Sequence, residues 1–192
     1  MTERLLKAKH WQIFGLLCGL PFLMEIVSMP VLFLGNPAKS IIPMMLIILI
    51  GLGGFLAWFW SIGMGMRRLI PEACRPKTGK FLFFLIYAMA YMLVFSVFIS
   101  YTFSSFNHIN EHQDVFAGMM FVIFPLHMFA MFAMFYCLYF VAKTYKTVEL
   151  QRTVTFSDFA GEFFLFWFFP IGIWVIQPKI NTMISGSENE QL

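Results

Sequence analysis

The chain has 192 residues, of which 60% are hydrophobic and only 12% are charged. Soluble domains carry about a quarter charged residues, so this composition excludes a soluble domain as the main body of the protein. The net charge of +3 is small. Its cations stand at the ends of apolar runs, where anionic lipid attracts them, so we expect membrane lipids and no nucleic acid as partners.

Five apolar runs follow one another along the chain, with short polar segments between them. They cover residues 11–34, 41–66, 81–101, 115–142 and 159–176. Because a helix needs about 20 mostly apolar residues to cross a membrane, the sequence predicts an all-α integral membrane protein, a bundle of five transmembrane helices with short loops. We expect one polytopic domain, residues 1–178, and then a short polar tail, 179–192, with a disordered end.

The first and fourth runs each carry a feature that affects the length or shape of the helix. The first follows a basic N-terminus, as in a signal peptide, but no small-residue cleavage site comes after it, so we expect it to be retained. Pro21 and Pro30 predict a kink within it. In the fourth run, no Gly or Pro occurs between Ala142 and Gln151, so its helix is expected to continue beyond the hydrocarbon core.

The fifth run allows two interpretations. Thr155 and Asp158 have the spacing of a capping box at a helix start, and the run that follows is long enough for a full span, which we expect. Pro170 and Gly172, however, fall in its middle. The alternative is a re-entrant or interfacial helix, which would leave four spans and return Lys179 to the side of the N-terminus.

The distribution of basic residues predicts the orientation. With the N-terminus inside, Lys39 and Lys179 are the outer basic residues and eleven others lie in inner segments. These eleven are Arg4, Lys7, Lys9, Arg67, Arg68, Arg75, Lys77, Lys80, Lys143, Lys146 and Arg152. Since basic loops stay in the cytoplasm, we expect a cytoplasmic N-terminus. The compact chain and short loops suggest a prokaryotic inner membrane.

Small residues recur at a spacing of four in the first two runs and predict close helix packing. The second run contains Gly53, Ala57, Ser61 and Gly65, and the first contains Gly15 and Gly19. Small side chains let two backbones approach closely in lipid. We expect an antiparallel contact between the first two helices, and a dimerisation face is the alternative.

Polar side chains within apolar runs are the candidates for function. Glu25, His127 and Glu162 are ionisable, and a charge at the centre of a membrane costs at least about 2.5–3.5 kcal/mol. Glu25 and His127 lie at similar depths, with Ser96 close to them, and could form a proton relay, a substrate contact or a buried hydrogen bond that fixes packing. Glu162 is interpreted as a first-turn residue favoured by the helix dipole.

The remaining polar motifs favour neither a cofactor nor a metal. His108, Glu111 and His112 match the H-x-x-E-H string of some metalloproteases, but the loop around them is too short for such a domain. A metal site formed by His108, His112 and Asp114 is a weaker alternative to a solvated loop. The three cysteines form no CxxC pair and are interpreted as free thiols.

Three functions remain open. Small size and the lack of catalytic groups favour a non-enzymatic accessory or structural subunit that packs against membrane partners. The segments 143–158 and 67–80 are its expected cytoplasmic docking elements. The alternatives are a small transporter or channel with a polar site at the depth of Glu25 and His127, and an intramembrane or lipid-modifying enzyme.

Overall fold

The computed structural model describes residues 2–34, 37–104 and 113–189, and over these ranges it contains helices and loops with no strand. This confirms the predicted all-α fold. The α-helices are α1 (Thr2–Lys7), α2 (His10–Phe14), α3 (Leu20–Leu34), α4 (Pro37–Trp60), α5 (Gly79–Ser104), α6 (Gln113–Leu150), α7 (Phe156–Trp167) and α8 (Phe169–Asn189). Gly15–Gly19 and Ser61–Gly65 are π-helical, and Met66–Leu69 and Glu72–Cys74 are short 3₁₀ segments.

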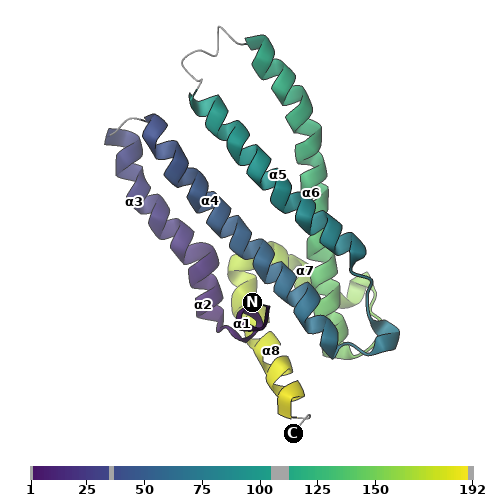
Figure 1. Cartoon of the computed structure of the whole chain (residues 1–192). Helices are drawn as coiled ribbons and strands as arrows, with labels where there is room; N and C mark the ends of the chain where they lie inside the picture. The colour runs from purple at the N-terminus through teal and green to yellow at the C-terminus, as the bar shows by residue number, and fades with distance from the viewer. Residues whose placement is uncertain (1, 35–36, 105–112, 190–192) are drawn as a thin grey trace.

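Four helical stretches within the described ranges are long and apolar enough to cross a membrane. They are His10–Val27, Met45–Leu69, Gly79–Ile99 and Gly118–Leu150. They form two antiparallel hairpins, α3 with α4 and α5 with α6, which stand side by side in chain order (Figure 1). Both ends of the described chain lie at the end of the bundle where the 67–80 loop lies, here called the basic end (Figure 1).

The helix α6 extends well past the apolar run that begins it. It has 38 residues and ends at Leu150, which confirms the expected continuation beyond Ala142. At 1.5 Å per residue it is about 57 Å long, nearly twice the thickness of a hydrocarbon core. Gln151 ends it with a φ of 51°, and its side-chain amide donates to the carbonyls of Val148 and Leu69 at 2.6 and 3.1 Å.

The fifth apolar run does not form one spanning helix. It is divided between α7 and α8, which meet at Phe168 and run in opposite directions, so that α8 returns to the basic end (Figure 1). Lys179 on α8 therefore lies 3.8 Å from Glu149 at the end of α6. The structure thus has two helices of reversed direction in place of a fifth long helix, as the alternative interpretation of this run expects. The domain boundary expected between residues 178 and 179 falls inside α8.

The sharp turn between α7 and α8 depends on Gly172. Pro170 stands in the first turn of α8, where its missing N–H is not needed. The N–H of Gly172 donates to the carbonyl of Phe168 at 2.9 Å. A Cβ atom at position 172 would overlap the carbonyl oxygen of Leu165, so the two helices can approach this closely only at a glycine.

The core is concentrated at the basic end. Its largest fully buried side chains include Trp58, Phe59, Phe81, Phe159 and Phe166. In contrast, no residue from 118 to 132, in the part of α6 farther from this end, is buried. The basic end is therefore a packed unit from which two loosely covered hairpins extend.

The first two spans pack against each other, but through different glycines from those predicted. A Cβ on Gly54 would lie 2.8 Å from Leu17, and one on Gly51 would lie 3.1 Å from Pro21. Nothing lies within 4 Å of such an atom on Gly15 or Gly53, so the contact predicted at these two positions is wrong.

The reason is the π-helical geometry of the small-residue segments. A π-helix has a wider turn than an α-helix, which shifts the faces that follow it. Residues 15–19 and 61–65 both adopt it. A spacing of four therefore does not keep Gly19 and Gly65 on the faces expected from an ideal α-helix. The close approach within the second segment is made by Gly63, 2.8 Å from Phe81 when a Cβ is added.

We predict that Gly172→Ala destabilises the protein by about 1–3 kcal/mol, because the added methyl group must displace backbone at the α7–α8 turn. Thermal unfolding in a mild detergent, followed by circular dichroism, measures the effect. Gly161→Ala is the matched control, since a Cβ there meets nothing within 4 Å and alanine favours a helix. Equal unfolding temperatures for the two variants would contradict the tight turn.

We predict that cysteines introduced at Lys77 and Ser185 react from the same side of the membrane, and one at Gln113 from the other. The chain returns through α7 and α8, and both Lys77 and Ser185 are exposed. An impermeant maleimide applied to intact cells, in a background without Cys18, Cys74 and Cys137, measures this. Labelling of positions 77 and 185 from opposite sides would show that α7 and α8 complete a span.

Candidate functional site

A cavity of about 260 Å³ lies between α4, α5 and α6. It is lined by Ile48, Leu49 and Leu52 of α4, by Ala88, Tyr91, Met92, Phe95 and Ser96 of α5, and by His127, Ala130, Met131 and Met134 of α6. The lining is almost wholly apolar, and three of its side chains are methionines, which adapt easily to irregular shapes.

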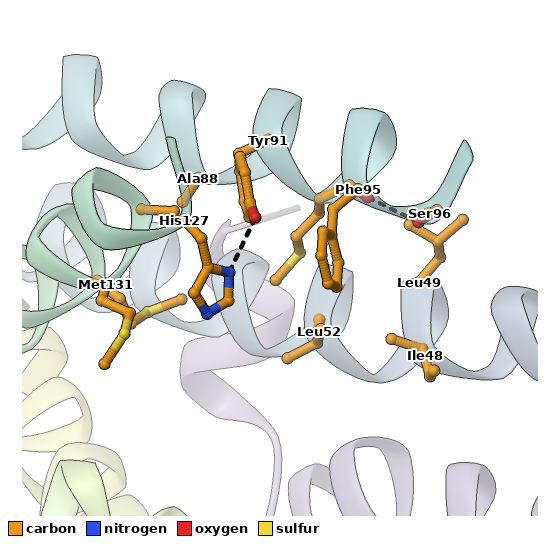
Figure 2. A pocket seen from close by; sticks show the side chains of 12 residues that line it. Ile48, Leu49, Leu52, Ala88, Tyr91, Phe95, Ser96, His127 and Met131 are labelled. Carbon is orange, nitrogen blue, oxygen red and sulfur yellow. Dashed lines mark hydrogen bonds between the residues drawn. The ribbon is translucent and has the colours of Figure 1, made fainter. Parts of the chain in front are cut away.

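The polar centre of this cavity is a hydrogen bond between Tyr91 and His127. The Tyr91 hydroxyl lies 2.8 Å from Nδ1 of His127, and the two side chains face each other across the gap between α5 and α6 (Figure 2). The ring of Phe95 lies against both, with centroid distances of 5.6 Å. The ring contacts with Tyr91 and Phe95 thus fix the orientation of the His127 imidazole.

The structure places the predicted residues Ser96 and His127 in the same cavity but gives them separate partners. The Ser96 hydroxyl donates to the carbonyl of Met92 at 2.6 Å, so it is satisfied within its own helix. Glu25, expected beside His127, is on α3, and α3 and α6 stand at opposite edges of the row of spans (Figure 1). Tyr91 takes the place predicted for Glu25.

A second polar group of residues joins α6, α7 and α8 at the basic end. Lys146 lies 2.6 Å from Glu149 and 2.8 Å from Glu162, and Lys179 lies 3.8 Å from Glu149. Glu162 is therefore in the second turn of α7, paired with Lys146, and the predicted role as a first-turn residue is wrong. The alternation of signs lets these partly buried charges compensate one another.

The acid in the first turn of α7 is Asp158. Its carboxylate accepts hydrogen bonds from the Thr155 backbone N–H at 2.8 Å and from the Arg152 guanidinium at 2.8 Å, which confirms the predicted helix start. The Arg152 hydrogen bond, followed by those of Thr155, holds the pKa of Asp158 well below its ordinary value. Asp158 therefore stays ionised at the N-terminus of α7, where the helix dipole favours a negative charge.

Gln177 is the residue that sequence reasoning missed most completely. It is fully buried, and its Oε1 accepts a hydrogen bond from the Trp58 indole N–H at 3.0 Å. Its Nε2 lies at hydrogen-bond distance from three carbonyls at the end of α1, those of Leu5, Leu6 and Ala8, at 3.2, 3.1 and 2.9 Å. The only sequence signal was an amide side chain directly after the apolar run 159–176.

The two segments expected to dock a cytoplasmic partner meet at the basic end but are only partly accessible. Residues 143–150 belong to α6, and four of these eight are buried, while residues 151–157 are exposed except for Val154. The hydrogen bond from Gln151 to the Leu69 carbonyl joins them to the 67–80 loop. On the other side of that loop, Arg68 forms a 2.6 Å ion pair with Glu3.

Within the described residues, no three His, Cys, Asp or Glu side chains come close enough to hold a metal ion. His108, Glu111 and His112 lie outside those residues, and so does the side chain of Asp114. The three cysteines are free thiols. Cys137 is fully buried among apolar side chains of the core, which makes it a packing residue.

We predict that Gln177→Leu lowers the free energy of unfolding by at least about 2 kcal/mol, because buried hydrogen-bonding groups of Trp58 and α1 lose their partner. Thr182→Ala on the exposed face of α8 is the control, since its hydroxyl bonds only to the carbonyl of Pro178. Thermal unfolding in detergent and limited proteolysis of the N-terminal segment measure the effect. A protease-resistant α1 in the leucine variant would contradict this role.

Comparison of the chain with known protein families, with curated proteins and with solved structures finds no match in any of the three. No relative therefore assigns a role to these residues. Their chemistry has to follow from the geometry: an aromatic cavity with one hydrogen-bonded histidine among the spans, and a packed polar assembly at the basic end.

Proposed function

We propose that this chain is a non-enzymatic membrane protein that serves as an accessory subunit and packs the exposed part of α6 against a second integral membrane protein. The observation that carries the proposal is that no residue between 118 and 132 is buried, whereas ten of the residues from 133 to 150 in the same helix are. This part of α6 contacts α5 on one side and leaves its other faces uncovered.

The backbone of this stretch favours a protein partner over lipid alone. Pro125 has no N–H, so the carbonyl of Phe121 lacks its usual donor within the helix. Phe121 is 84% exposed, the most exposed large apolar side chain in the described chain. Acyl chains cannot donate to a carbonyl, whereas a polar side chain of a neighbouring helix can.

A comparison with α3 supports the choice of α6. Pro21 likewise has no N–H, and the carbonyl of Leu17 lies in the turn before it. That carbonyl, however, lies about 4.0 Å from a Cβ placed on Gly51, so α4 covers it. Pro125 and Phe121, by contrast, are both exposed, and we therefore expect the partner on this face of α6.

The basic end supports the same proposal by offering a second surface for attachment. Phe156 is 53% exposed at this end of the bundle, where Arg152 and Lys77 are also exposed. An exposed aromatic ring among basic residues is suited to an acidic, partly apolar segment of another subunit. These residues are the accessible part of the two docking segments predicted from the sequence, 143–158 and 67–80.

The test is photo-crosslinking in native membranes with a benzophenone amino acid placed at Phe121 or at Phe132. We expect one discrete protein adduct at both positions, because they lie on the uncovered part of α6. Mass spectrometry of the adduct distinguishes a different subunit from a second copy of this chain.

Phe22 on α3 is the matched control, because it is an exposed phenylalanine on another candidate span. We expect it to give no discrete protein adduct. Diffuse lipid adducts at all three positions, or the same protein adduct at Phe22, would contradict a partner held on α6.

A further inference from the structure

The imidazole of His127 offers a hydrogen-bond donor to the cavity between α4, α5 and α6. Tyr91 is 9% exposed, and within the described chain its hydroxyl has Nδ1 of His127 as its hydrogen-bond partner. A buried hydroxyl that donates to nothing loses about 1–3 kcal/mol. Tyr91 therefore donates to Nδ1, and the ring hydrogen lies on Nε2.

The opposite arrangement would leave an unsatisfied group. If Nδ1 carried the hydrogen and donated to Tyr91, the hydroxyl hydrogen of Tyr91 would lack an acceptor among the described residues. If the ring were doubly protonated, Nε2 would again be a donor. The arrangement that satisfies the Tyr91 hydroxyl therefore leaves Nε2–H as a donor for an acceptor that enters the cavity.

Nε2 points away from Tyr91 into the space between Leu52 and Met131 (Figure 2). No protein group of the described chain accepts its hydrogen. Leu52 and Met131 are 37% and 46% exposed, so the cavity is open at the surface of the bundle. Among candidate membrane spans, such an opening faces the acyl chains of the bilayer.

The depth of the site limits the charge of the molecule it can hold. Tyr91 lies twelve residues from the start of α5 and thirteen from its end, which places it about 18 Å from the first residue at 1.5 Å per residue. That is near the middle of the span. A charged group is costly at this depth, whereas an uncharged group that accepts one hydrogen bond is not.

We propose that this cavity binds an uncharged amphiphile through a carbonyl oxygen, which accepts a hydrogen bond from Nε2 of His127. The volume of about 260 Å³ is below the usual range of small-molecule pockets, about 300–1,000 Å³. The cavity therefore holds the carbonyl group and the adjoining part of the amphiphile. The rest of the apolar chain of the amphiphile lies along the open side of the cavity toward α4. The carbonyl belongs either to an acyl ester or to a ring ketone such as a quinone.

The test uses a long-chain methyl ketone that bears a diazirine and an alkyne, added to the full-length protein in detergent micelles. After irradiation, we expect labelled peptides from α4, α5 and α6 at the cavity. A saturated methyl ketone should compete with the label, and the alkane of the same length should compete about fivefold less well, the effect of one net hydrogen bond. Methyl laurate and decylbenzoquinone as competitors distinguish an ester from a ring ketone.

Three variants show whether the histidine is responsible. His127→Phe should reduce labelling about fivefold, whereas His127→Gln, which keeps a donor, should retain most of it. His10→Phe, at a histidine packed on Trp174 outside the cavity, should label like the unmodified chain. Equal labelling of His127→Phe, equal competition by the alkane, or label spread over all exposed spans would overturn the proposal. Circular dichroism and size-exclusion chromatography confirm that each variant is folded.

Discussion

The side-chain amide of Gln177 is the contact on which the arrangement of the basic end depends. It is buried with no exposed surface and connects three segments that are far apart in sequence: α1, the end of α4 through Trp58, and α8. An amide can donate and accept at the same time. It can therefore satisfy the indole N–H on one side and the last carbonyls of α1 on the other. Without it, the indole N–H of Trp58 and the carbonyl of Leu6 would lose their partner, whereas the carbonyl of Ala8 would keep the Asn181 amide.

This contact explains why the protein is dense at one end and open at the other. The re-entrant pair α7 and α8 fills the space among α1, α4 and α6 at the basic end, where the largest aromatic side chains are fully buried. It does not extend to the far ends of the spans (Figure 1). The uncovered part of α6 and the cavity beside Tyr91 follow from this division.

The helices could be predicted from the sequence because apolar runs and helix caps are local signals. The length of α6 and the start of α7 at Thr155 are examples. The reversal at Phe168 was harder, because the clash that requires Gly172 involves the backbone of Leu165 in the folded turn. The partner of His127 could not be found either. Tyr91 is one aromatic residue among many in its run, and its pairing depends on how α5 and α6 are rotated against each other.

The position of Gln177 also has a consequence for the order in which the protein is assembled. The carbonyl of Leu6 and the amide that binds it are separated by 171 residues, nearly the whole length of the chain. At about 5–20 residues per second, synthesis of that interval takes many seconds. The carbonyl of Leu6 therefore stays without this amide until α8 has been made. Throughout that interval, α1 is accessible to proteases and chaperones.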